Sequence, residues 1–128
     1  MSSYKVVCIC DPDKPDENVF FMYTVGLYPE RQELCASNVP RKCVDGVCKL
    51  MNFLSTRTLL PGRTTGFKYQ KEETDKIEHM QFVLEKPPKK IRNLLLNDYL
   101  LKMNRKAQVL LLLPLTPFPD GGWRASTY

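Results

Sequence analysis

The sequence contains a single histidine, His79, and no apolar run long enough to cross a membrane. Its most apolar stretch, Gln108 to Leu115, is far shorter than the roughly 20 residues that a membrane-spanning helix needs, so we expect a core strand there. The N-terminal sequence MSSYKVVCICDPD lacks a basic region, and its short apolar run ends in acidic residues, so no secretory signal is predicted. We therefore expect a cytoplasmic protein with no membrane partner.

The motifs of common catalytic and cofactor sites are also missing. The sequence has no G-x-S-x-G, no H-E-x-x-H and no phosphate-binding P-loop. A nucleophile with a histidine base would have to use His79, which follows Glu78 at the start of a predicted strand and lies outside any nucleophile motif. We assign no catalytic residue and no cofactor, and these absences favour a role other than catalysis without deciding the question.

The five cysteines are an odd number, and together with the missing signal this indicates reduced thiols. Cys8 and Cys10 would face the same side of a strand, but a zinc site needs four ligands at suitable spacing. Cys43 and Cys48 are five residues apart, which places them on different faces of a helix. We therefore predict no metal site and interpret the cysteines as small buried apolar residues. The full set is Cys8, Cys10, Cys35, Cys43 and Cys48.

The net charge of +5 is concentrated in one basic segment. Between Glu85 and Lys106, seven lysines and arginines stand against only Glu85 and Asp98, and the rest of the chain is neutral. A run of this kind is typical of a solvated helix face, and it would also attract nucleic-acid phosphates or an acidic protein. The candidate basic face consists of Lys89, Lys90, Arg92, Lys102, Arg105 and Lys106.

A chain of 128 residues is the size of one domain and can bury a core without a disulfide or a metal ion. In residues 59–78, Pro61, Gly62 and Gly66 predict a loop over the first half, and we expect the mixed charges of the second half to be solvated. The element order β-β-β-α-β-α-β predicts a single α+β domain over residues 1–128, with a mostly antiparallel or mixed sheet and two packed helices. The predicted strands cover residues 4–10, 18–28, 33–37, 79–85 and 107–115, and the predicted helices cover residues 38–57, capped by Asn38, and 89–104.

Gly26 interrupts the apolar strand that runs towards Pro29. A glycine inside a strand lowers stability, so it indicates either a bulge or a place where another group approaches the backbone closely. The first alternative needs no ligand. The second would form a small ligand pocket, and its candidate lining residues are Tyr23, Thr24, Gly26, His79 and Asp120.

The segment MYTVGLYPERQELCASNVP resembles the signature of an uncharacterised domain-of-unknown-function family. Residues 23–27 match the family's Tyr-Thr-Val-Gly-Leu strand, and Val39 and Pro40 stand at the family's entry into a helix. The C-terminal sequence is similar to the family's tyrosine-bearing helix, its strand that begins with glutamine and its closing Trp-Pro-Asp-x-x-Gly, with Trp123 displaced. The family occurs in bacteria, microbial eukaryotes and large DNA viruses. The resemblance implies an α+β layout and a cytosolic setting, or the host cytoplasm or virion of a virus, and it implies no reaction.

Three functions remain open on the sequence alone. The absence of catalytic groupings and the apolar strand VFFMYTVGLY, which needs a cover on both sides, favour a non-enzymatic protein-interaction domain that associates with itself as a homodimer. The first alternative is a small-ligand-binding or hydrolytic domain with a pocket near Tyr23 to Leu27. The second is non-specific nucleic-acid binding through the basic helix 89–106.

Overall fold

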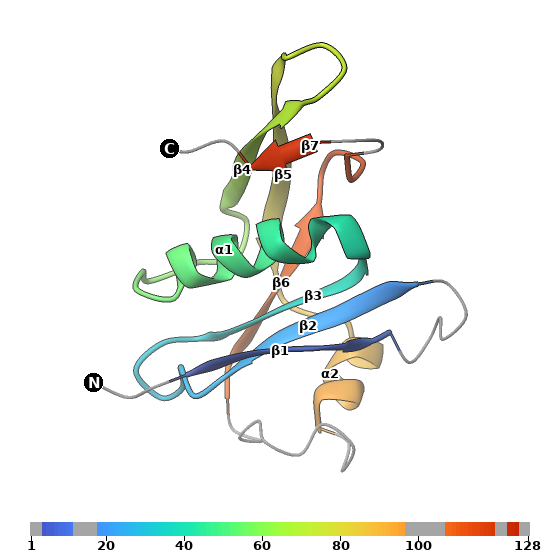
Figure 1. Cartoon of the computed structure of the whole chain (residues 1–128). Helices are drawn as coiled ribbons and strands as arrows, with labels where there is room; N and C mark the ends of the chain where they lie inside the picture. The colour runs from blue at the N-terminus through green and yellow to red at the C-terminus, as the bar shows by residue number, and fades with distance from the viewer. Residues whose placement is uncertain (1–3, 12–17, 97–106, 120–122, 126–128) are drawn as a thin grey trace.

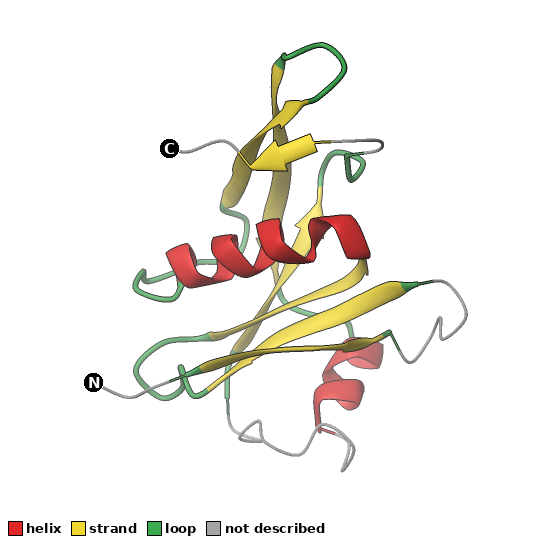
Figure 2. Ribbon diagram, in the orientation of Figure 1, coloured by secondary structure: helices red, strands yellow, loops and turns green. Residues whose placement is uncertain are grey.

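A mixed sheet of seven strands forms the centre of the computed structural model, which describes residues 4–11, 18–96, 107–119 and 123–125. Two α-helices pack against the sheet (Figures 1 and 2), so the predicted α+β fold with a mixed sheet and two packed helices is confirmed. The elements are β1 (Lys5–Cys10), β2 (Val19–Val25), β3 (Glu33–Pro40), the 3-10 helix η1 (Arg41–Cys43), α1 (Val44–Leu54), β4 (Thr64–Lys71), β5 (Ile77–Glu85), α2 (Lys89–Leu96), β6 (Val109–Pro114) and β7 (Trp123–Ala125).

The strands are arranged in the order β1-β2-β3-β6-β5-β4-β7. β3 and β6 run parallel, with Leu34 opposite Leu110, and every other neighbouring pair of strands is antiparallel. β6 lies inside the sheet, as its unbroken apolar sequence predicts. The parallel pair joins an N-terminal half of the sheet, β1 to β3, to a C-terminal half, β4 to β7.

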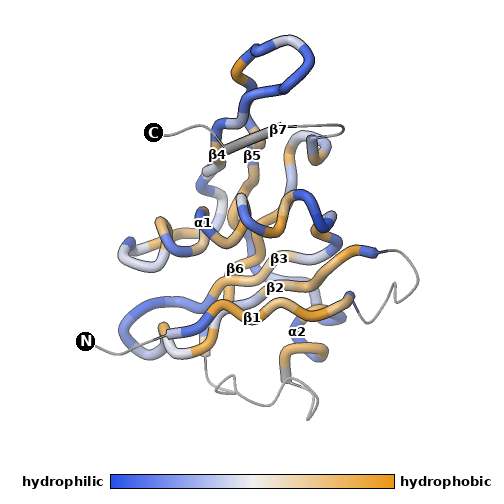
Figure 3. Tube along the Cα trace, in the orientation of Figure 1, coloured by the Kyte–Doolittle hydropathy of each residue, from blue (hydrophilic) through white to orange (hydrophobic). Residues whose placement is uncertain are grey.

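Each face of the sheet has its own apolar core. Because successive residues of a strand point to opposite faces, Met22 of β2 packs on the α1 side while its neighbours Phe21 and Tyr23 pack on the α2 side. Figure 3 shows the apolar stretches that run along β1 and β2. The two helices therefore cover both sides of the apolar β2, and a second copy of the chain is not needed for that purpose. The α1 core also contains Leu34, Val47, Met51, Met80 and Phe82, and the α2 core contains Cys35, Leu95, Val109 and Leu111.

β4 corrects the expectation of a loop over the first half of residues 59–78. Phe67 and Tyr69 point into the α1 core, while Lys68 between them is exposed, which is the alternation of a strand with one buried face. The mixed charges, which we expected to be solvated, occupy outward positions of β4 and the hairpin turn before β5. β7 adds a further strand in the turn-rich tail, where the Trp123 ring stacks on Phe67 with 5.9 Å between centroids.

The first helix begins later than the sequence predicts. β3 continues to Pro40, and Asn38 lies within it at a φ of +57°, with its N–H donating to Asp11 Oδ2 at 3.1 Å. Asn38 is therefore not the helix cap. The residue that precedes α1 is Cys43, whose side chain makes no capping hydrogen bond.

Gly46 marks the closest approach of α1 to the sheet. A Cβ atom at this position would lie 2.9 Å from Phe67 Cζ and 3.2 Å from Trp123 Cη2, closer than carbon atoms normally approach. A glycine in a helix costs up to ~1 kcal/mol relative to alanine. Here the missing side chain allows α1 to pack directly on the aromatic rings of β4 and β7.

The second helix is described over Lys89–Leu96, and its predicted continuation over residues 97–104 lies outside the described residues. Ile91, Leu94 and Leu95 pack on the sheet, as their helical spacing predicts. No helix in the described ranges is both long and apolar enough to cross a membrane.

Candidate functional site

A buried carboxylate, Glu33, organises the chain around residues 24–27. Its side chain is 2 % exposed and accepts three hydrogen bonds. The Thr24 hydroxyl and the Leu27 N–H donate to Oε1 at 3.0 and 3.1 Å, and the Gly26 N–H donates to Oε2 at 3.0 Å. The Thr24 oxygen also accepts from the Leu34 N–H at 2.8 Å. The end of β2 is thus held to the start of β3 by a satisfied polar network.

This network explains Gly26 without a ligand. The φ of Gly26 is +106°, a conformation that glycine adopts readily and that a residue with a Cβ adopts only at a cost. β2 ends at Val25, so the glycine follows the strand, and the irregularity of β2 lies instead between Phe20 and Met22. The prediction of a bulge at Gly26 is therefore wrong. Gly26 lies in the turn after β2, where its N–H donates to Glu33.

Among the described residues of the predicted ligand pocket, His79 lies apart from Tyr23, Thr24 and Gly26. Tyr23 and Thr24 are buried, Tyr23 in the α2 core, where burial raises its pKa, and Thr24 in the Glu33 network. His79 is exposed on β5, opposite Lys68, and two strands, β3 and β6, separate β5 from β2. Asp120 lies outside the described residues.

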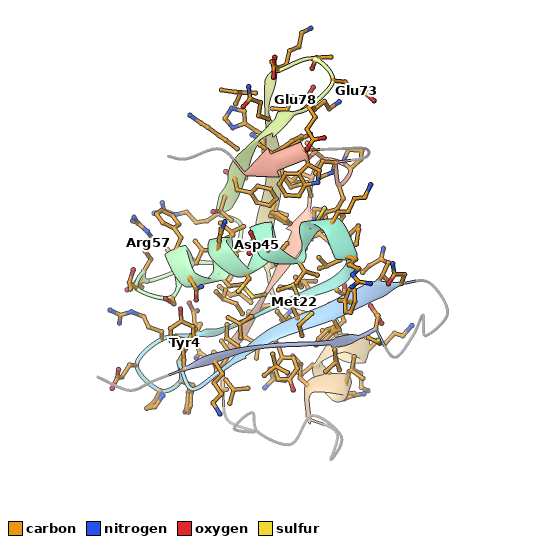
Figure 4. The ribbon with its side chains drawn as sticks, in the orientation of Figure 1. Tyr4, Met22, Asp45, Arg57, Glu73 and Glu78 are labelled. Atoms are coloured by element: carbon orange, nitrogen blue, oxygen red, sulfur yellow. The ribbon has the colours of Figure 1, made fainter. Side chains whose placement is uncertain are left out.

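An ionisable cluster lies at the border of the α1 core on the β4–β5 hairpin, on the face opposite to His79, and its Glu78 is labelled in Figure 4. Tyr69 Oη donates to Glu78 Oε2 at 2.9 Å, and Lys71 Nζ lies 3.5 Å from the same oxygen. Burial, together with the hydrogen bond to Glu78, raises the pKa of Tyr69 to about 12. The Tyr69 hydroxyl and the Lys71 charge in turn lower the pKa of Glu78. The cluster holds the hairpin together and contains no nucleophile with an adjacent base.

The basic face is described only in part. Lys89 and Lys90 are exposed in the first turn of α2, and Arg92 is half-buried beside them. The remaining residues of this face lie outside the described residues, so nucleic-acid binding stays a prediction. They are Lys102, Arg105 and Lys106.

β1 presents an edge of the sheet. In the part of the chain that the structure describes, no strand pairs with its outer side. The Asp11 N–H donates to the Val19 carbonyl at 3.0 Å, towards β2. Inward and outward hydrogen-bonding residues alternate along an antiparallel strand, so the N–H and C=O groups of Val6, Cys8 and Cys10 point away from β2. The opposite edge, β7, has only three residues.

Two of the five cysteines are exposed, two are buried, and Cys48 is half-buried. Cys8 and Cys10 are exposed on β1, which corrects the interpretation that they are buried, because an edge strand leaves part of its face uncovered. Cys35 and Cys43 are buried as predicted, and burial raises their pKa values to about 12 and about 11. The pKa of Cys8 is also raised, mainly because the side chain is partly buried and to a smaller extent because Cys10 and Cys48 lie nearby.

We expect alkylation of the native protein by iodoacetamide at pH 8 to modify Cys8 and Cys10 well before Cys35 and Cys43. The reactive species is the thiolate, and the two buried thiols combine raised pKa values with blocked access. Timed alkylation followed by peptide mass spectrometry measures the rates, and the urea-unfolded chain is the control in which the differences should largely disappear. Modification of Cys35 as fast as that of Cys10 in native protein would contradict the described burial.

A groove of about 510 Å³ opens beyond the C-terminal end of α1. Its walls come from residues 53–65, which leave α1 and enter β4, and from Leu84 of β5. Arg57 and Arg63 both line it, and its lining contains no acidic residue. Figure 4 shows Arg57 at this end of the helix. Sequence reasoning overlooked this groove, although two arginines among four threonines in STRTLLPGRTT were its signal.

No group of three histidine, cysteine, aspartate or glutamate side chains placed to hold a metal ion occurs among the described residues. The chain was compared with known proteins at three levels. No protein-family model, no curated protein and no solved structure matched it. The resemblance to the Tyr-Thr-Val-Gly-Leu family therefore stays a prediction, and function has to be argued from the geometry of β1 and of the groove.

Proposed function

We propose that this protein is a non-enzymatic interaction domain that forms a homodimer by pairing β1 with β1 of a second copy. The observation that carries the proposal is the open outer edge of β1, which has the sequence KVVCIC and a single charge, at Lys5. Proteins usually protect such an edge with prolines, charged side chains or a bulge. β1 has no proline and no bulge, and its one charge is at its first residue, so Val6 to Cys10 are unprotected. An unprotected apolar edge is well suited to pairing with an identical strand around a two-fold axis.

The alternation of hydrogen bonds restricts the register of such a pair. Val6, Cys8 and Cys10 point their backbone groups outward, so they must face one another across the two-fold axis. Pairing Cys8 with Cys8 aligns Val6 with Cys10 and gives roughly six hydrogen bonds across the edge. A shift of one pair would leave Val6 or Cys10 without an outward-pointing partner in β1 and would give roughly four hydrogen bonds. The number of hydrogen bonds therefore favours the register centred on Cys8.

The dimer has a specific chemical signature. Residues in a hydrogen-bonded antiparallel pair have Cα atoms about 5.5 Å apart, which lies within the range that a disulfide spans. We expect the wild-type protein to show twice its chain mass in light scattering at micromolar concentration. Mild oxidation with diamide should then link the two copies through Cys8, as detected by non-reducing electrophoresis and peptide mapping.

Three variants separate pairing from cross-linking. Cys8→Ser should remain a dimer without the cross-link, and Cys10→Ser should keep both properties. Cys8→Pro removes an N–H that points outward, so it should give a monomer while the β1–β2 pairing remains. Its urea midpoint checks that the domain is still folded. A wild-type monomer at these concentrations, or a folded Cys8→Pro dimer, would overturn the proposal.

A further inference from the structure

We propose that the groove at the end of α1 binds a phosphate group carried by a small molecule with a flat apolar body. This inference is independent of self-association, because the groove involves α1, β4 and β5 and not the β1 edge. Its volume of about 510 Å³ is within the usual range for small-ligand sites.

The charges and donors of the groove suit a phosphate. Arg57 and Arg63 are exposed, and no carboxylate of the described residues is paired with either guanidinium. Guanidinium groups bind phosphate through charge-assisted and often bidentate hydrogen bonds, and threonine hydroxyls supply further donors. A neighbouring groove formed with the β2–β3 loop shares Arg57, Thr58 and Leu59 with this one, but it also includes Glu30, which makes it less suitable for an anion. The hydroxyl donors of the proposed site are Thr58, Thr64 and Thr65; the hydroxyl of Thr56, which also lines the groove, already donates to the Phe53 carbonyl.

The C-terminal end of a helix normally disfavours an anion, because its last carbonyl groups carry partial negative charge. In α1 this effect is reduced, since hydrogen bonds cap the last four carbonyls. The Met51 and Leu54 carbonyls accept from backbone N–H groups at 2.9 and 3.0 Å. The Asn52 and Phe53 carbonyls accept from the Ser55 and Thr56 hydroxyls at 2.7 and 3.5 Å. The two arginine charges therefore dominate the groove.

The apolar side of the groove suits the flat apolar body of the proposed ligand. Phe53 is 55 % exposed, and its ring lies under the Arg57 guanidinium, with Cζ 4.2 Å from the ring centroid. This stacking holds the guanidinium in place while its N–H groups remain free to bind in the guanidinium plane. Leu59 and Leu84 are buried and complete an apolar wall. In a phosphate monoester of a ring compound, the phosphate would bind the arginines and the ring would contact the apolar wall.

The test is calorimetric titration of the full chain with four probes: phenyl phosphate, inorganic phosphate, benzoate and a short oligothymidylate. We expect saturable binding of phenyl phosphate, tighter than that of inorganic phosphate or benzoate. Arg57→Gln and Arg63→Gln should each weaken it about tenfold, the effect of losing one charge-assisted hydrogen bond. Arg41→Gln, an exposed arginine at the other end of α1, removes the same charge and should leave the affinity unchanged.

Every outcome of this experiment bears on the proposal. Absence of saturable phenyl phosphate binding at millimolar concentration would overturn it, as would equal losses in Arg41→Gln and Arg57→Gln. Benzoate binding as tight as phenyl phosphate would reject the phosphate preference. Oligothymidylate binding more tightly than phenyl phosphate would overturn the assignment to a small molecule. A Phe53→Leu variant that weakens phenyl phosphate and leaves inorganic phosphate unchanged would confirm the role of the ring.

Discussion

Glu33→Ala is expected to lower the free energy of unfolding by about 3–5 kcal/mol, an effect large enough to unfold many domains of this size. The substitution leaves the Thr24 hydroxyl and the N–H groups of Gly26 and Leu27 without their acceptor in a buried environment. Each unsatisfied buried donor costs about 1–3 kcal/mol, and partial entry of water reduces the sum. Urea unfolding followed by circular dichroism measures the change.

Glu33→Gln is the matched control because it keeps the shape of the side chain. Its amide oxygen can still accept from Thr24 and Leu27, but its NH2 group would face the Gly26 N–H, donor against donor. We expect a loss of about 1–3 kcal/mol, between wild type and alanine. Equal stability of all three proteins would show that the network contributes nothing to folding.

Phe82→Ala is the second substitution with a large expected effect, a loss of about 3–5 kcal/mol. Phe82 is fully buried on β5, with ring centroids 6.3 Å from Phe67 and 6.0 Å from Phe118. Alanine removes the ring and leaves a cavity between the sheet and its aromatic neighbours, which relax only in part. Chemical unfolding monitored by tryptophan fluorescence gives the midpoint and the slope.

The control on the same strand is Ile77→Ala. Ile77 is 58 % exposed, so its truncation should change stability by no more than about 0.5 kcal/mol. A similar effect for both variants would mean that Phe82 does not pack in the α1 core as described.

The apolar pattern of the sequence predicts the centre of the fold because burial on both faces leaves a strong signal. β2, which is apolar except for Thr24, and β6, which is an unbroken apolar run, both lie inside the sheet. The helical spacing of Ile91, Leu94 and Leu95 likewise predicts that α2 packs on the sheet. β4 was not predicted, because Gly66 and the neighbouring charged residues resemble a loop. The alternation of Phe67 and Tyr69 with Lys68 is nevertheless the pattern of a strand with one buried face. β7 is three residues long, too short for any periodicity.

The candidate sites were less predictable, because they depend on contacts between distant segments. Glu33 reads as an ordinary charged residue at the start of a strand, and only the fold brings it under the Gly26 turn. Conversely, Gly26 and His79 suggested one pocket, but the strand order separates them. The strand order also leaves β1 at a free edge. This order is hard to predict from the sequence, because the chain crosses over so that β6 pairs with β3.

That crossover also shapes how the chain can fold. The antiparallel neighbours β1, β2 and β3 are joined by short connections, as are β4 and β5, so the loops they close cost little chain entropy. The parallel contact of β3 with β6 joins Glu33 to Val109, whose separation along the chain makes it the most entropically expensive pairing in the sheet. We expect the two halves to collapse locally first and to meet late. The α1 helix, which touches β3 in one half and β4 in the other, is the element that would lock their alignment.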